Sequence, residues 1–190
     1  MLKLDAVNRM LTSIGQTPAS TVIENYHPDV LSALSVILSA SKKIQTKGYW
    51  FNTDHNLTLT PNALTGEILL PSTTLSVDPV DTTLHYVQRG SRLYDSSNST
   101  FEIGAPVIVT LIQNLDFEEL PEVAANYIME DSLYIFVRDR IGDNVKMQEI
   151  KADREMARRL LNAEDIRYSG ILLSNNPSVS SMLSNVRPSR

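Results

Sequence analysis

The stretch Lys47-Gly48-Tyr49-Trp50-Phe51 marks the place where a long helical pattern ends and a strand-like pattern begins. It holds the only tryptophan of the 190-residue chain, with a tyrosine before it and a phenylalanine after it. Each buried aromatic side chain removes roughly 150–250 Å² of surface from water, so three adjacent rings can hold several elements together. We therefore expect this aromatic block, residues 49–51, to be a packing joint between the preceding helix and the following strands.

Two helices are predicted before the aromatic block. Apolar residues between positions 4 and 14 recur at spacings of three, four and three, which is one face of a helix, and Gly15 supplies its stop. A longer helix is predicted to begin at Pro28, because the first helical position needs no N–H partner. It is predicted to end at Gly48, after lysines that suit the negative end of the helix dipole.

Beyond the block, glycines and prolines cut residues 57–115 into pieces too short for ordinary helices. The strand-like runs between them are 57–59, 68–70, 84–88 and 107–112. Arg89-Gly90-Ser91 is typical of a hairpin turn. The sequence therefore predicts a small antiparallel β subdomain, although the pattern does not assign the individual strand pairs.

The last third of the chain is again helical in pattern. Residues 119–141 are apolar on nearly every side, which predicts a helix enclosed by its neighbours. Residues 145–167 form another helix, whose narrow apolar seam is predicted from Met147, Ile150, Ala157, Leu160 and Leu161. The other sides of this helix alternate in charge at four-residue steps, through Lys151, Glu155 and Arg159.

The predicted fold class is α+β. Residues 1–55 and 117–170 are expected to form a helical bundle domain, with residues 56–116 inserted as the β subdomain. Residues 171–190 are rich in serine, asparagine and proline, which predicts an extended, flexible C-terminal arm.

Composition narrows the classes of function. The chain has no cysteine, which excludes disulfides, thiolate zinc sites and cysteine nucleophiles. No stretch has the apolar length of a membrane span, and charges among the first ten residues are unlike a secretory signal, so we expect a soluble protein made in a cytoplasm. Residues 51–118 carry two basic residues against eight acids, which is a poor match to nucleic acid. We expect a solvated surface there, or one past which DNA can move without binding.

The residue patterns indicate no catalytic, cofactor or metal site. The three histidines lie far apart and show no metal-ligand spacing. An acidic cluster between positions 116 and 122 is expected to complement the positive end of the helix that follows it. The alternative is that carboxylates of this cluster, held at the right separation, carry out glycoside hydrolysis.

A series of short motifs follows one another along the chain. They are Ala6-Val7-Asn8, Ser13-Ile14-Gly15, the stretch from Gln45 to Asn52, Leu57 to Pro61, Leu93-Tyr94-Asp95 and Arg158-Arg159-Leu160. Together these motifs resemble the tail tubular protein A family of short-tailed podovirus phages, and the resemblance covers nearly the whole chain. One departure is Tyr49, because the family usually places tryptophan directly after the glycine.

The resemblance implies a non-enzymatic protein of the virion tail that is assembled in the host cytoplasm. Such proteins form a homo-oligomeric ring, usually of twelve copies, between the portal protein and the tail nozzle (tail tubular protein B). The ring extends the DNA channel, helps to attach the tail fibres and lets DNA pass without specific binding. No cofactor and no membrane contact is implied.

Two segments are predicted to contact these partners. The charged helix suits side-by-side contacts in a ring, and the residues predicted for it are Lys151, Glu155 and Arg159. The arm is predicted to hold the portal or a neighbouring subunit, through Arg187, Pro188 and Arg190. Two other functions stay open, namely a hydrolase that acts on cell-wall glycans of the host through Glu118 and Glu119, and a monomeric binding module.

Overall fold

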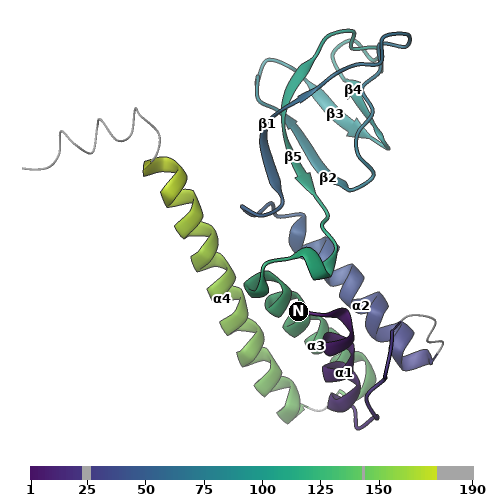
Figure 1. The fold of residues 1–190 in the computed structure, drawn as a ribbon, viewed down its shortest axis with the longest axis vertical. Helices are drawn as coiled ribbons and strands as arrows, with labels where there is room; N and C mark the ends of the chain where they lie inside the picture. Colours follow the sequence, from purple (N-terminus) through teal and green to yellow (C-terminus); the bar gives the residue numbers. More distant parts are fainter. Residues whose placement is uncertain (23–26, 143, 175–190) are drawn as a thin grey trace, which may run out of the picture.

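The chain folds into a group of helices with a β subdomain at one end (Figure 1). The computed structural model describes residues 1–22, 27–142 and 144–174. The helices are α1 Lys3–Ser13, α2 Pro28–Gln45, α3 Glu122–Arg140 and α4 Asn144–Ser174, with a short 3-10 helix, η1 Phe117–Glu119, before α3. Antiparallel strands lie between α2 and η1 in the sequence, so the predicted α+β class is confirmed.

Pro28 begins α2 and Gly15 ends α1 as predicted, whereas α2 ends earlier than predicted. Pro28 is the first residue of α2, and His27 caps it by accepting a hydrogen bond from the Asp29 N–H at 3.3 Å. Gly15 ends α1 at a φ of +79°. The helix α2 ends at Gln45, three residues before the predicted stop, and Gly48 turns the chain at a φ of +74°.

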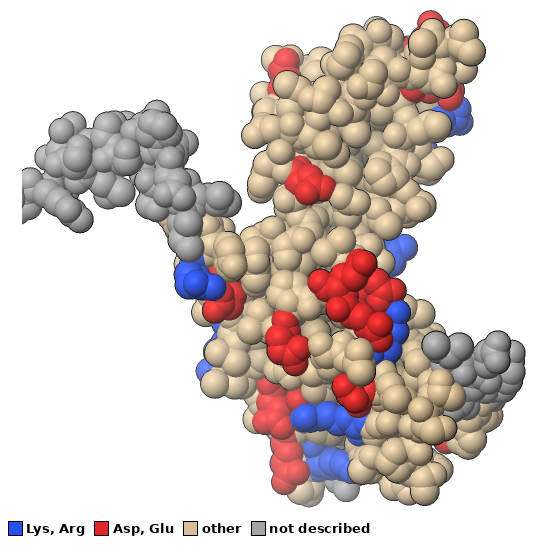
Figure 2. Space-filling view, viewed as in Figure 1, with Lys and Arg blue, Asp and Glu red and all other residues tan. Residues whose placement is uncertain are grey.

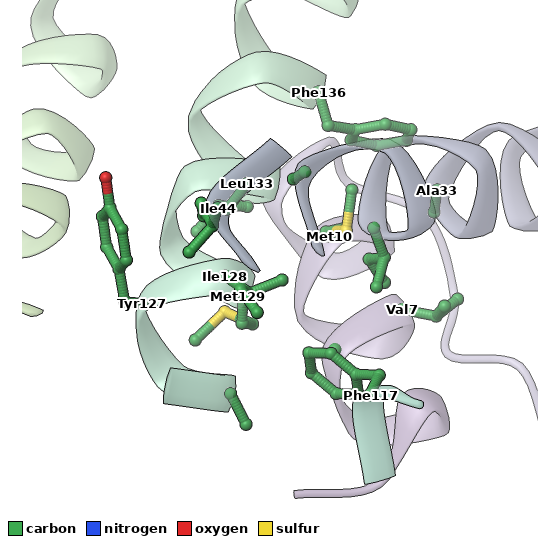
Figure 3. Close-up of a cluster of buried hydrophobic side chains, with 14 of the residues drawn as sticks. Val7, Met10, Ala33, Ile44, Phe117, Tyr127, Ile128, Met129, Leu133 and Phe136 are labelled. Atoms are coloured by element: carbon green, nitrogen blue, oxygen red, sulfur yellow. The ribbon is translucent and has the colours of Figure 1, made fainter. Parts of the chain in front are cut away.

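The helix α3 forms the centre of the helical part. Its seven consecutive residues from Tyr127 to Leu133 are all buried, which confirms the predicted enclosed helix. Figure 3 shows side chains of α1, α2 and α3 meeting in this core, among them Met10, Ala33 and Phe136. The helix begins at Glu122 rather than at the predicted 119, because residues 117–119 form the separate turn η1.

Two buried carboxylates of α3 join it to other helices. Glu130 accepts a hydrogen bond from Arg9 of α1 at 2.6 Å, and burial raises the pKa of the Glu130 carboxyl although Arg9 opposes the shift. Asp131 is 1% exposed and accepts from Arg154 of α4 at 2.6 Å, while Lys43 of α2 lies 3.9 Å away. These ion pairs attach α1 and α4 to α3.

The β subdomain contains a three-stranded sheet and a hairpin. Its strands are β1 Thr53–Leu59, β2 Thr74–Pro79, β3 Tyr86–Arg89, β4 Arg92–Asp95 and β5 Val107–Gln113. The strand β5 lies between β1 and β2 and is antiparallel to both, while β3 pairs with β4. The predicted hairpin turn is confirmed, with Gly90 at a φ of +63°.

The sheet has one buried face. Val107, Val109 and Leu111 of β5 are buried at alternate positions, whereas Ile108 between them is 50% exposed. Two details differ from the prediction. Within residues 68–70, Leu69 forms an isolated bridge to Arg92 rather than part of a strand, although Ile68 and Leu70 are buried. The strand β2 was not predicted.

The helix α4 packs along α3 and continues past the predicted helix end at 167 (Figure 1). It passes through Gly170 without a break and runs to Ser174, so residues 171–174 are helical rather than part of an arm. The rest of the predicted arm, residues 175–190, lies outside the described residues. Among the described residues, no helix is long and apolar enough to cross a membrane.

A buried polar network connects the helices to the β subdomain. The Gln45 side chain is fully buried at the end of α2, and its Oε1 accepts from the Leu115 N–H at 2.9 Å while its Nε2 donates to the Leu115 carbonyl at 3.0 Å. Asn52, which is 3% exposed, donates to the carbonyls of Gln45 and Gln113 at 2.9 and 2.7 Å. The chain enters the β subdomain beside Asn52 and leaves it beside Leu115, so both crossings are held at one place.

The aromatic block packs at this joint, as predicted. Tyr49 is buried and stacks on Phe51, with ring centroids 5.6 Å apart. Burial raises the pKa of the Tyr49 hydroxyl to about 12. Trp50 is partly buried, meets Phe51 edge to face and stacks on Tyr168 of α4 at 4.9 Å. Trp50 therefore connects this joint to the C-terminal half of α4.

We predict that Gln45→Leu lowers the free energy of unfolding by about 2–4 kcal/mol, because it leaves the N–H and C=O of Leu115 without their buried partner. Urea denaturation measures the change. The matched control Gln16→Leu, at an exposed position, should stay within about 0.5 kcal/mol of the parent protein. A Gln45→Leu variant as stable as the control would show that the network does not hold the joint.

A second prediction concerns the attachment of α4. Arg154→Leu should destabilise the protein by about 3 kcal/mol or more, since it leaves the buried Asp131 carboxylate with only the more distant Lys43, 3.9 Å away. The double variant Asp131→Leu/Arg154→Leu should recover most of that loss. Arg138→Leu, which breaks an exposed pair with Asp139, should cost at most about 1 kcal/mol in the same urea titration. Equal losses for Arg154→Leu and Arg138→Leu would contradict the assignment.

Candidate subunit interface on the longest helix

One side of α4 is covered by the rest of the chain. The helix has 31 residues, so it is about 46 Å long at 1.5 Å per residue. Within positions 144–170, the buried side chains are Ile150, Ala157 and Leu161. These positions belong to the predicted apolar seam, and Met147 packs partly against the same core. This long helix therefore packs against the rest of the chain through a narrow set of buried side chains.

The opposite side of α4 carries a second series of apolar residues. Exposed large apolar residues outside the inner seam are Val145 at 73%, Ile166 at 72%, Met156 at 53% and Leu160 at 47%. Leu160 was predicted to lie in the inner seam, and this was wrong. At about 100° per residue it is turned well away from its neighbour Leu161, and Leu161 takes the inner position. We call Val145, Ala152, Met156, Leu160 and Ala163 the outer apolar stripe.

The sequence reasoning missed this stripe as a feature, although a signal for it exists. Val145, Ala152, Met156 and Ala163 recur at spacings of seven, four and seven, which keeps them on one side of a helix. The inner seam has the same type of spacing, so two apolar series share one helix. Apolar residues on two sides of one helix indicate that both sides pack against other protein surfaces.

The three charged residues predicted for an interface all lie outside the inner contact. Lys151 is exposed and makes no ion pair with any described residue. Glu155 pairs with Arg158 at 2.8 Å, and Arg159 donates to the Glu155 carbonyl at 3.3 Å. These side chains border the outer apolar stripe on one side. The other predicted contacts, Arg187, Pro188 and Arg190, lie outside the described residues.

Carboxylates of the acidic cluster, residues 116–122, accept hydrogen bonds from the beginning of α1. Figure 2 shows this acid-rich patch near the beginning of α1, below the β subdomain. Lys3 donates to Asp116 at 2.8 Å, which lowers the pKa of the Asp116 carboxyl, and the Lys3 N–H donates to Glu118. Glu118 and Glu119 are both exposed on η1. The hydrolase alternative needs two buried carboxylates from separate elements, and these two residues do not provide them.

The histidines also stay apart from one another. No group of three or more His, Cys, Asp or Glu side chains within the described residues could hold a metal ion. The candidate surface for partner contact is the outer side of α4, where exposed apolar residues recur along one helix.

Comparison with known proteins agrees with a role in assembly. The family model of the tail tubular protein matches residues 4–171. Tail tubular protein A of Klebsiella phage KP34 is 29% identical over 145 residues, which cover 76% of this chain and 76% of that protein. The matched region spans the helices, the joint and the β subdomain. The chain therefore belongs to the tail tubular protein family and is a structural component of a phage tail.

Proposed function

We propose that this protein is a portal adaptor that forms a homo-oligomeric ring in the tail, with twelve copies as the number that the family resemblance implies. The ring stands between the portal protein and the nozzle protein, continues the DNA channel and helps to attach the tail fibres. Assembly takes place in the host cytoplasm. In this proposal the segment 175–190, with Arg187, Pro188 and Arg190, contacts the portal or a neighbouring copy.

The observation that carries the proposal is the exposure of α4. Most helical stability in proteins comes from packing of an apolar side rather than from intrinsic propensity. The helix α4 buries one narrow seam and leaves Val145, Met156 and Leu160 exposed outside it. An apolar stripe bordered by charged residues is typical of a surface that meets another protein. A neighbouring copy that covers this stripe would complete the packing of the helix.

The charge of the β subdomain supports its place beside a DNA channel. Residues 56–116 carry two arginines, and each is already engaged within the subdomain. Arg92 pairs with Glu67 at 2.7 Å, and the Arg89 guanidinium lies 3.6 Å from the centroid of the Tyr94 ring. Binding to DNA is driven by cations that neutralise phosphates. Because both arginines are already engaged, this acidic subdomain is expected to repel DNA weakly and to let it slide past.

The test is ring formation on the portal protein of the same phage, scored by electron microscopy of the complex and by the bound copy number. We predict that Met156→Asp/Leu160→Asp weakens ring formation at least tenfold, because each carboxylate would be buried in an apolar contact. Both positions are about half exposed in the subunit, so the isolated chain should keep its helical content and thermal stability.

The matched control is Leu64→Asp, at a leucine of the β subdomain that is 96% exposed. It should form rings like the parent protein. Rings that form equally well with Met156→Asp/Leu160→Asp would refute the α4 contact, and a parent protein that forms no ring on the portal would refute the adaptor function itself.

A further inference from the structure

The two sides of α4 that flank the outer apolar stripe carry opposite charge. One side, the basic side, holds Lys151, Arg158 and Arg159, and the other, the acidic side, holds Glu149, Asp153 and Glu164. At about 100° per residue the centres of the two sides lie about 180° apart around the helix. The inner seam lies in one arc between them and Val145, Ala152 and Met156 lie in the other, whereas Leu160 lies on the acidic side, between Glu149 and Asp153.

The two sides also face different parts of the molecule. On the acidic side, Lys146 donates to the Ser13 carbonyl, which turns this side towards α1. On the basic side, Lys47 at the end of α2 donates to Asn162 at 3.0 Å. Figure 2 shows acidic residues gathered along the N-terminal half of α4, at the lower left. The sides are therefore separate surfaces of the whole subunit.

Pairing within the helix leaves an excess of one sign on each side. Arg158 is paired with Glu155, and Arg167 is paired with Glu164. Lys151 and Arg159 on the basic side make no ion pair among the described residues, and neither do Glu149 and Asp153 on the acidic side. All four are exposed and lie in the same part of the helix, residues 149–159.

We infer that a second copy of this chain docks by placing its acidic side of α4 against the basic side of the first, with the two helices running in the same direction. This inference rests on the proposed ring and adds the polarity of the contact. A two-fold contact through either side would set like charges against each other, which is unfavourable. A contact between unlike sides is heterologous, so it repeats from copy to copy, and it forms a ring when the rotation between copies closes.

The experiment exchanges the charges of each side and measures ring formation on the portal protein. Lys151→Glu/Arg159→Glu makes both sides acidic, and Glu149→Lys/Asp153→Lys makes both sides basic. Either double variant alone should form rings at least tenfold less well than the parent at about 0.05 M NaCl, with a smaller loss at about 0.5 M NaCl, since salt screens exposed charges. The quadruple variant, and an equal mixture of the two double variants, should return to within about threefold of the parent.

The outcomes separate this inference from the proposed function. Glu102→Lys, an exposed charge reversal in the β subdomain, is the matched control and should assemble like the parent. If the parent forms rings and the double variants do so equally well, the polarity is wrong while the adaptor function stands. A mixture of double variants that stops at dimers would show a two-fold contact and overturn the inference. Failure of the parent to form rings would overturn both.

Discussion

The hydrogen bonds of Gln45 and Asn52 are the constraint on which the arrangement of the two parts depends. A helix end and the ends of strands leave backbone N–H and C=O groups without partners in either element, and such groups are costly when buried. At this joint two buried side chains supply the missing partners. Gln45 serves both polar groups of Leu115, and Asn52 joins the last carbonyl of α2 to the carbonyl of Gln113. The helices and the subdomain thereby share one anchored crossing.

The same joint sets the position of the candidate interface. The Trp50 ring stacks on Tyr168, and the Trp50 N–H donates to Asp165 at 3.3 Å, so the far half of α4 is attached to the hinge rather than only to α3. The near half is attached through Arg154 and the buried Asp131. With both halves fixed, the charged sides of α4 keep one orientation relative to the β subdomain. The proposed ring would need this property, because every copy would have to present the same contact side at the same angle.

Local patterns were sufficient for the helices and for the hairpin. The seven buried residues in the centre of α3 and the turn at Gly90 follow from signals within a few neighbouring positions. The features that were not predicted depend on contacts between residues that are distant in the sequence. The strand β2 is recognisable through its pairing with β5, which lies about thirty residues further on, and Pro79 at its end suggested a loop. Leu160 was predicted in the seam, whereas Leu161, about 100° further around the helix, is buried and Leu160 is exposed. The Gln45 network was visible as a motif, but its partner Leu115 is seventy residues away.

Because the hydrogen bonds of Gln45 close the joint, the helices and the β subdomain should move as one body. Hydrogen exchange of individual backbone amides tests it most directly, since exchange reports the free energy of local opening. The Leu115 amide is bonded to a side chain rather than within a helix or sheet, and we expect it to exchange as slowly as amides in the centre of α3 such as that of Ile128. A Leu115 amide that exchanges as fast as those of the exposed loop at residues 62–65 would contradict it.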